Sequence, residues 1–360
     1  MPALILLTAP LEDALLPRMD VSEVADRIGG MRQQEETAYL CHDYLAITAD
    51  VRSTARKPVD EDCRVKMTEW SYQVVDFCKF RRETVAIGMS FLDRFLSTPA
   101  GIHALLDRKS YQLAAMTTLY MAIKLHEPIE METSLLADLS RGCYNEVEIA
   151  EMEGDILEAL RWRVMGPTPL AFVQHFLALL PSNIHASVAN AVMDYARFQT
   201  ELAVSDYSFV VCPYSHIAMA SVLNAVEGID RNLFPLKQQG KFLRTLENFS
   251  GIMVEQVAET QTYLNNILVD VFAVDESPQS SVHAKTSPDS VARTGIFRSP
   301  SKNQFSQQPG HAASQVTAQG QSRQRKTSFS NNIRAKVNTS PVGVVAEIGQ
   351  TTRSRQPYIY

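Results

Sequence analysis

Residues 111–124, YQLAAMTTLYMAIK, would carry apolar or small side chains on nearly every side of a helix. Small residues such as Ala114, Ala115 and Ala122 stand among larger apolar ones. A helix that is apolar around most of its circumference is stable only when neighbouring elements cover it on all sides. The chain is therefore predicted to fold as a bundle around at least one central helix.

The rest of the chain from about residue 33 to residue 270 also shows a helical pattern. Apolar residues recur at intervals of three and four, as Val85, Met89, Leu92 and Leu96 do, and this spacing is typical of one face of a helix. Glycine is sparse, and the alternating pattern of strands is absent. The sequence predicts an all-α fold.

A boundary between two helical halves is indicated near residue 167. Thr168 followed by Pro169 predicts a helix start, because threonine is a good N-cap and proline is favoured at the first helical position. Gly166 and Pro167 are predicted to close the preceding helix, which carries residues 151–162. The second half has a stretch of small and apolar residues, 213–228, at a position comparable to that of residues 111–127 in the first half. This weak similarity predicts two similar helical units in tandem.

We therefore divide the chain into four segments: an N-terminal extension (1–32), a first helical domain (33–166), a second helical domain (167–274) and a tail (275–360). The tail is rich in Ser, Thr, Gln, Pro and Asn, a composition that predicts disorder. Its Ser-Pro pairs suit phosphorylation by proline-directed kinases, and its basic cluster suggests nuclear import. A plain solvated tail is the alternative.

The charge is unevenly distributed along the chain. Residues 1–274 hold 23 Lys and Arg against 36 Asp and Glu, a net charge of −13, whereas residues 275–360 have a net charge of +7. An acidic body argues against a phosphate backbone as the main partner. We therefore predict no nucleic-acid partner. As a separate expectation, we place the protein in the nucleus and the cytoplasm.

The cysteines and the apolar runs exclude other classes of protein. The five cysteines form no CxxC pair, so we predict reduced thiols and no metal site. No apolar run is long enough to cross a bilayer, and residues 1–17 lack the basic start of a signal peptide. We therefore predict no membrane partner.

The sequence contains no recognisable catalytic constellation. It has no GxGxxG, GxxxxGK[ST], HExxH or GxSxG motif, and its eight histidines are dispersed. The acidic cluster at residues 145–155 is most simply a solvated helix face. We predict no enzymatic activity, no catalytic residue and no cofactor, and an interaction protein is favoured.

The stretch FLDRFL, residues 91–96, places two charges among four large apolar side chains. A buried carboxylate without a partner costs several kcal/mol. Asp93 is therefore expected to be paired, while Arg94 is expected to point to solvent on the other side of the turn.

Five stretches together resemble the cyclins, and most closely the D-type group: residues 63–77, 91–97, 111–127, 151–177 and 209–225. The resemblance covers roughly residues 33–270. It implies two stacked five-helix cyclin boxes without enzyme activity. The implied function is a regulatory subunit that binds and activates a cyclin-dependent serine/threonine kinase in cell-cycle control of the G1/S type.

The resemblance also assigns roles to single residues. It pairs Arg64 with Asp93 as a structural ion pair, and it makes Lys124 and Glu153 the contacts to the kinase. Spacing alone would make Lys124 a solvated lysine at a helix end and Glu153 an exposed helix acid. Only the joint match of the motifs favours the kinase-binding role.

Many cyclins dock Arg-x-Leu peptides of substrates or inhibitors on a shallow apolar patch. The corresponding positions here are Cys63, Lys66, Trp70, Gln73, Tyr111 and Gln112. Only Trp70 and Gln112 match the family, while Lys66 puts a cation in the apolar floor and Gln73 replaces an acid. We expect weakened docking of basic-apolar peptides, and an ordinary packed aromatic residue is the alternative for Trp70.

Two further motifs bear on the partners. The LxCxE motif that many D-type cyclins carry for pocket proteins is absent, and RTLENF (244–249) resembles a docking peptide but falls in a predicted helix. The competing hypothesis is a cyclin-box adaptor in transcription. That function would favour a basic body, which residues 1–274 do not have.

Overall fold

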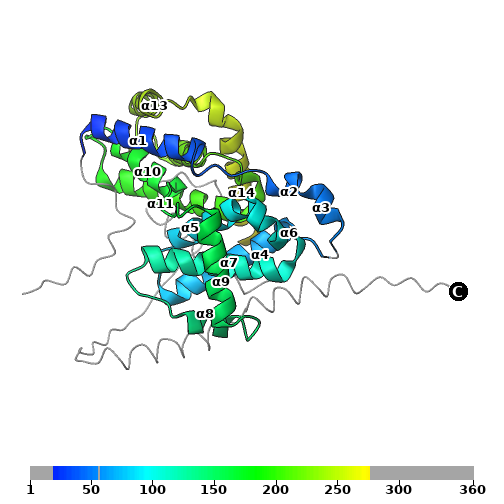
Figure 1. The fold of residues 1–360 in the computed structure, drawn as a ribbon. Helices are drawn as coiled ribbons and strands as arrows, with labels where there is room; N and C mark the ends of the chain where they lie inside the picture. The colour runs from blue at the N-terminus through cyan, green and yellow to red at the C-terminus, as the bar shows by residue number, and fades with distance from the viewer. Residues whose placement is uncertain (1–18, 56, 276–360) are drawn as a thin grey trace, which may run out of the picture.

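The computed structural model describes residues 19–55 and 57–275 of the chain. Within this part the structure is helical and contains no β-strand, only one isolated bridge between Lys57 and Asp107. The helices form two bundles, one above the other in Figure 1. This confirms the predicted all-α fold with two boxes. The predicted disorder of the tail concerns residues outside the described part.

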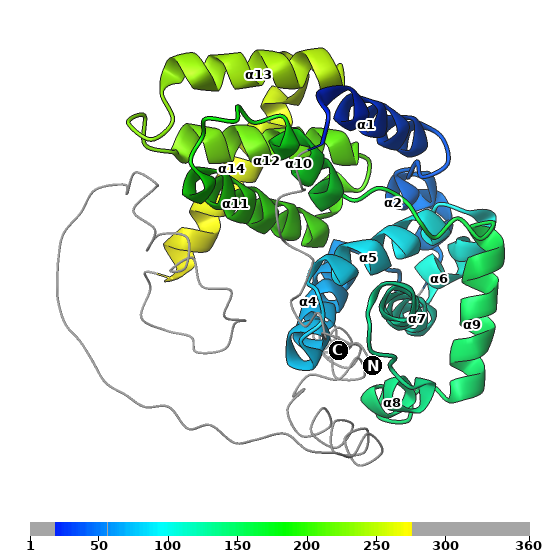
Figure 2. The same cartoon turned by 90° about the vertical axis from the view of Figure 1, so that its left-hand side faces the viewer.

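The first bundle is built around α7 (Arg108–His126). Its other long helices are α4 (Glu61–Cys78), α5 (Glu83–Leu96), α8 (Thr133–Leu139) and α9 (Glu146–Ala159), and its short ones are α2 (Tyr44–Ile47), α3 (Ala49–Ser53), η1 (Pro99–Gly101) and α6 (Ile102–Leu106). Figure 2 looks along α7 and shows α4, α5, α6, α8 and α9 around it. From residue 111 to residue 123, only Leu113 is not fully buried. The predicted central helix is thus present.

The contact between α5 and α7 depends on Gly88. A Cβ atom at Gly88 would lie 3.1 Å from the Cα atom of Leu119 on α7. The two helix backbones therefore approach more closely than a side chain at this position would allow. This close approach fixes α5, which carries the FLDRFL motif, against the centre of the bundle.

The second bundle consists of α10 (Pro169–Ala178), α11 (Ala186–Ser205), η2 (Tyr207–Phe209), α12 (Tyr214–Gly228), α13 (Leu236–Ser250), η3 (Val254–Val257) and α14 (Ala258–Asp275). The small-residue helix α12 is largely buried. As predicted, the side chain of Thr168 accepts a hydrogen bond from the backbone of Ala171, at 3.0 Å, and Pro169 is the first residue of α10.

The preceding helix ends earlier than the sequence indicates. It was predicted to carry residues 151–162, but α9 stops at Ala159. Arg161 and Trp162 adopt left-handed backbone conformations, with φ of 52° and 57°. Two consecutive left-handed residues cannot continue a right-handed helix, so the chain leaves α9 before Gly166 and Pro167 are reached.

The first helix, α1 (Val21–Glu36), spans the predicted boundary at residue 32 and packs on the second bundle. Its residues Val24 and Ile28 belong to the second core. The carboxylate of Glu35 accepts hydrogen bonds from the backbone N–H, at 2.9 Å, and from the hydroxyl of Ser215 at the start of α12. The carboxylate thereby caps that helix, where negative charge is favoured.

We predict that replacement of Glu35 by Gln removes part of the pH dependence of stability. Burial raises the pKa of Glu35, although the hydrogen bonds from Ser215 oppose this. The folded state thus holds the proton more tightly than the unfolded state, and the stability gained at low pH is lost as pH rises above the ordinary glutamate value of 4.5. The free energy of unfolding of the wild type, minus that of Glu35→Gln, should therefore fall as pH rises.

Urea unfolding between about pH 4 and pH 8 measures this difference. Glu36→Gln is the matched control, because it removes a carboxylate from the same turn of α1 but leaves the buried Glu35 in place, and the Glu36 side chain is 59% exposed. A Glu35→Gln profile parallel to that of the wild type would contradict the prediction.

Candidate functional site

Asp93 on α5 pairs with Arg64 on α4, as the resemblance implied. The guanidinium Nη1 of Arg64 donates to Oδ1 of Asp93, and Nη2 lies 3.1 Å from Oδ2. The two side chains are only 5% and 6% exposed. The hydroxyl of Tyr44 also donates to Oδ1, at 3.0 Å. Both oxygens of the buried carboxylate therefore accept hydrogen bonds.

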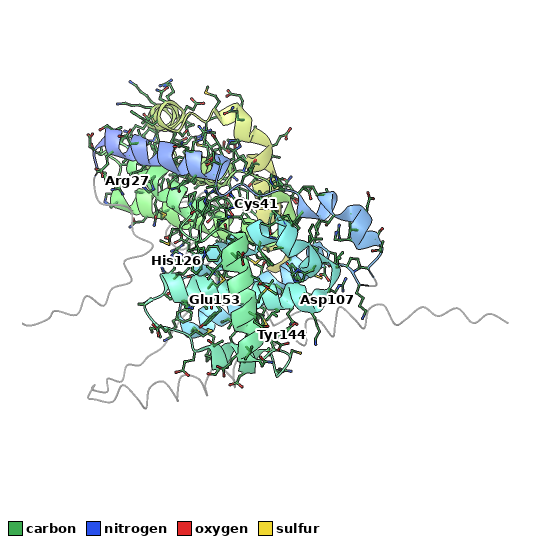
Figure 3. The ribbon with its side chains drawn as sticks, in the orientation of Figure 1. Arg27, Cys41, Asp107, His126, Tyr144 and Glu153 are labelled. Carbon is green, nitrogen blue, oxygen red and sulfur yellow. The ribbon has the colours of Figure 1, made fainter. Side chains whose placement is uncertain are left out.

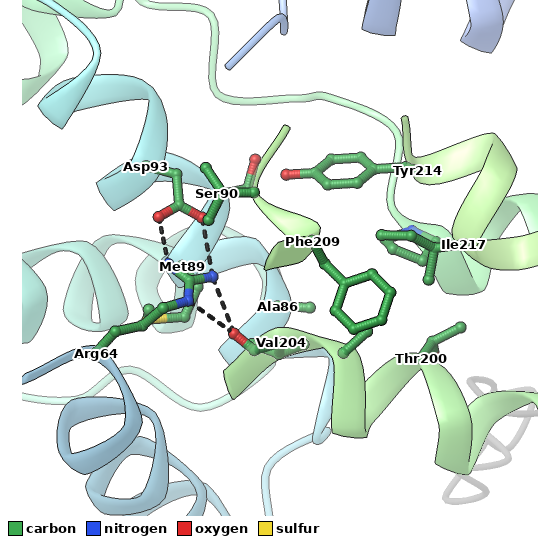
Figure 4. A pocket seen from close by; sticks show the side chains of 13 residues that line it. Arg64, Ala86, Met89, Ser90, Asp93, Thr200, Val204, Phe209, Tyr214 and Ile217 are labelled. Atoms are coloured by element: carbon green, nitrogen blue, oxygen red, sulfur yellow. Dashed lines mark hydrogen bonds and ion pairs between the residues drawn. The ribbon is translucent and has the colours of Figure 1, made fainter. Parts of the chain in front are cut away.

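Arg64 also joins the two bundles. Its Nε and Nη2 atoms donate to the backbone carbonyl of Val204, at 3.2 and 2.9 Å, in the last turn of α11. Figure 4 shows this arrangement, with the guanidinium between Asp93 and Val204. Burial disfavours the charge of Arg64, but the carboxylate of Asp93 more than offsets this, and the net shift of the pKa is upward. The pair thus holds both boxes together.

A small cavity of about 40 Å³ lies beside this pair, between the two bundles (Figure 4). Apolar side chains such as Met89, Phe209 and Ile217 line most of it, with Thr200 and Ser90 as polar neighbours. A volume of this size fits a few water molecules, not an organic cofactor. Residues 19–55 and 57–275 contain no group of three or more side chains suited to bind a metal ion. None of their helices could span a bilayer.

Arg94 does not point to solvent, so the sequence-based expectation for this residue is wrong. The residue is only 5% exposed. Its Nη2 donates to the carbonyl of Arg163 at 2.8 Å, and its guanidinium lies 4.4 Å from the ring centre of Tyr39. Tyr39 belongs to the segment that leads from α1 to α2, and this segment covers the end of α5. Burial lowers the pKa of Arg94.

Lys124 and Glu153 lie side by side on the surface of the first box. Lys124 is near the end of α7. Glu153, which is labelled in Figure 3, is in the middle of α9. The Lys124 Nζ atom donates to Oε1 of Glu153 at 2.9 Å. This hydrogen bond raises the pKa of Lys124. The Lys124 side chain is 50% exposed and that of Glu153 is 18% exposed, so a partner protein can reach both.

Local sequence signals place Glu153 at this edge. Asn145 caps α9 with its side chain, and Glu148 completes the capping box, which fixes where the helix starts. Ile149, Met152 and Ile156 of α9 face the core. Glu153 lies beside Met152 and Ile156 on the helix, at the border between the buried face and solvent.

Large apolar side chains are exposed near the ends of α7 and α9. Beyond Lys124, Leu125 is 45% and Ile129 is 53% exposed, and beyond α9, Trp162 is 73% and Met165 is 65% exposed. The exposure of Trp162 was not predicted from the sequence, because residues 151–162 were assigned to one helix. Exposed tryptophan is uncommon and is enriched where proteins bind each other.

The six positions of the peptide-docking patch do not form an open apolar surface. Cys63, Trp70, Tyr111 and Gln112 are each at most 2% exposed, and Lys66 pairs with Asp62 at 3.0 Å. The Trp70 indole N–H and the Gln112 amide N–H groups have no partner within the described part of the chain. Gln73 is partly exposed, and its side chain already interacts with another group of the protein. Peptide docking stays a prediction.

Two models of protein families match adjacent parts of the chain, and curated relatives of the same family match it as well. The model of the cyclin N-terminal domain matches residues 28–165, and that of the cyclin C-terminal domain matches residues 167–300. G1/S-specific cyclin-D1 of Danio rerio is 29% identical over 174 residues, which are 48% of this chain and 57% of that protein. The Homo sapiens protein of that name is 26% identical over 212 residues, 59% of this chain and 67% of that protein.

A solved structure supports the fold alone. A viral cyclin from herpesvirus saimiri superimposes with a TM-score of 0.50 at 16% sequence identity, and the superposition covers 72% of this chain and all of the viral one. The likeness extends over both bundles because it covers more residues than either bundle contains.

Proposed function

The chain belongs to the cyclin family, and on this basis we propose that it is a regulatory subunit that binds and activates a cyclin-dependent serine/threonine kinase. The observation that carries the proposal is the reachable Lys124–Glu153 pair on the first box, at the two positions where the family contacts its kinase. Cyclins act as regulatory subunits, so the catalytic residues belong to the kinase.

The proposed mechanism is preferential binding to one state of the kinase. An active kinase has its regulatory helix turned inward, so that a Lys–Glu ion pair forms in its active site. A partner that binds this state better shifts the population toward it. A shift from 1:99 to 99:1 requires a preference of about 5.5 kcal/mol.

Lys124 and Glu153 can supply part of this preference. Lys124 lies in the last turn of α7 and can donate to main-chain carbonyls of the kinase, while Glu153 can accept from its N–H groups. Each would exchange its present partner for one on the kinase. Burial of Leu125, Ile129 and Trp162 would add an apolar contribution of roughly 25 cal/mol per Å².

We further propose cell-cycle control at the G1/S transition, as in the relatives named above. Presence in the nucleus and the cytoplasm, and phosphorylation of the Ser-Pro pairs in the tail, belong to this proposal. The alternative, an adaptor in transcription, finds less support, because residues 1–274 carry a net charge of −13 and would repel a phosphate backbone.

Capture of the bound kinase tests the proposal. The tagged full chain should retain a cyclin-dependent kinase from a cell extract. The purified chain should also raise the rate at which that kinase phosphorylates a Ser-Pro peptide, by up to about a hundredfold if the active state rises from 1% to 99%. Retention of transcription factors without any kinase would instead support the adaptor.

A further inference from the structure

The outer face of α13 is basic, although the second box as a whole is acidic. Residues 167–274 contain five Lys and Arg side chains, and four of them lie between residues 231 and 244. Arg231, Lys237, Lys241 and Arg244 are all exposed. Lys237, Lys241 and Arg244 lie on α13 itself, and we call these three residues the α13 basic face.

The cations on α13 form one stripe on the side opposite the core. Residues 237, 241 and 244 follow the spacing of one helix face, whereas Phe242 and Leu246 point into the second core. Burial of Leu246 also means that RTLENF is not available as a docking peptide. The stripe is therefore directed away from the protein.

None of the four cations is neutralised within the described residues. The remaining cation of the second box, Arg197, has Asp194 at 3.0 Å. No ion pair or hydrogen bond within the described residues involves the side chain of Arg231 or those of the α13 basic face. The nearby acids have other roles: Asp230 accepts from the backbone of Asn232, and Glu247 accepts from the backbone of Val254. The positive potential of this face is thus available to a partner.

Apolar side chains border the basic face. Leu233 is 45% and Leu236 is 57% exposed before and at the start of α13, and Phe249 is 39% exposed near its end. A Cβ atom at Gly240 would meet nothing within 4 Å, so the helix surface between Leu236 and Arg244 is open. Cations flanked by exposed apolar groups suit a ligand that has both acidic and apolar side chains.

From these observations we propose that the α13 basic face docks an acidic peptide segment of a partner protein, a segment that also carries apolar residues. The cations are spaced about 6 Å and about 4.5 Å apart along the helix axis. Side chains on one face of an extended peptide repeat about every 6.6 Å. Acids at alternate positions of the peptide can therefore reach successive cations.

A peptide fits this face better than a nucleic acid does. The stripe from residue 237 to residue 244 is only about 10 Å long and is flanked by leucines rather than by further cations. A long polyanion would also extend over a body whose net charge is strongly negative. A short acidic segment avoids this repulsion.

The basic face lies far from the proposed kinase contacts. In both Figure 1 and Figure 2, α13 is at the upper edge of the molecule, whereas α7, α8 and α9 belong to the lower bundle. A peptide on α13 and a kinase on the first box can therefore be bound at the same time. The inference does not depend on the proposed function.

Fluorescence anisotropy with the full chain and without kinase tests the proposal. The probe is a labelled nine-residue peptide with Glu at alternate positions and Leu at both ends, and Gln replaces Glu in the control peptide. The combined change Lys237→Glu, Lys241→Glu and Arg244→Glu should weaken binding of the Glu peptide by at least about tenfold. A peptide with Lys in place of Glu should in turn bind this variant better than the wild type.

The variant Lys57→Glu, Lys79→Glu and Lys109→Glu is the matched control, because it changes the net charge equally at exposed lysines of the first box. It should bind the Glu peptide nearly as the wild type does. Equal weakening by both triple variants would overturn the proposal, as would tighter binding of an oligonucleotide than of the Glu peptide to this face. Peptide binding only after removal of residues 1–18 would mean that the chain covers the face itself, and would also overturn it.

Discussion

Asp93→Ala is expected to lower the free energy of unfolding by about 3–5 kcal/mol. The substitution leaves the guanidinium of Arg64 buried, with a side chain only 5% exposed, and with the Val204 carbonyl and the Tyr44 hydroxyl as its remaining partners. The Tyr44 hydroxyl loses the acceptor of its own hydrogen bond as well. Urea unfolding at neutral pH measures the effect.

Asp62→Ala is the control for this experiment, because Asp62 also pairs with a cation on α4 but is 63% exposed. An exposed pair contributes at most about 1 kcal/mol. Replacement of both buried partners, as in Arg64→Met with Asp93→Leu, should cost less than Asp93→Ala alone, because no buried charge remains. Wild-type stability of Asp93→Ala would show that the pair does not hold the fold.

The fold follows from local patterns in the sequence to a large extent. The central position of α7 could be predicted, because a helix with small and apolar residues on all sides needs neighbours on all sides. The start of α10 could be predicted as well, because Thr168 and Pro169 act within one helical turn. Each of these signals lies entirely within the element that it determines.

The sequence could not predict contacts that depend on distant segments. Arg94 follows Asp93 directly, and its burial arises from Tyr39, which lies 55 positions earlier in the chain. The bond from Arg64 to the Val204 carbonyl likewise depends on how the second box packs on the first. The spacing of apolar residues in the sequence shows which face of a helix is buried, but not which distant segment covers it. The exposure of Trp162 escaped prediction because the left-handed turn that ends α9 contains no glycine.

The candidate site shows the same limit. The resemblance identified Lys124 and Glu153 separately, but their hydrogen bond arises only because α7 and α9 pack side by side. The α13 basic face could not be predicted from the net charge, since residues 1–274 are acidic as a whole. Only the placement of the cations on the outer side of one helix shows that they act together.

Lys124→Ala combined with Glu153→Ala is expected to weaken kinase binding by about 2–5 kcal/mol, or about 30- to 5,000-fold in Kd. Two hydrogen bonds to charged groups would contribute about 1.5–3 kcal/mol each, but binding must first separate the existing pair. An exposed pair of this kind contributes at most about 1 kcal/mol, so most of the new interaction remains. Titration of the kinase identified by capture, followed by calorimetry, measures the change.

Lys109→Ala combined with Glu151→Ala is the matched control, because it removes the same charges from the same two helices. Both residues are exposed, Lys109 lies in the first turn of α7, and Glu151 points away from Glu153 around α9, since two helical positions differ by about 200°. This control should bind and activate the kinase as the wild type does. Urea unfolding should show that both double variants remain within about 1 kcal/mol of the wild type. If the Lys124/Glu153 variant is as stable as the control and activates the kinase equally well, the pair is only a surface ion pair of the first box. The kinase then binds elsewhere.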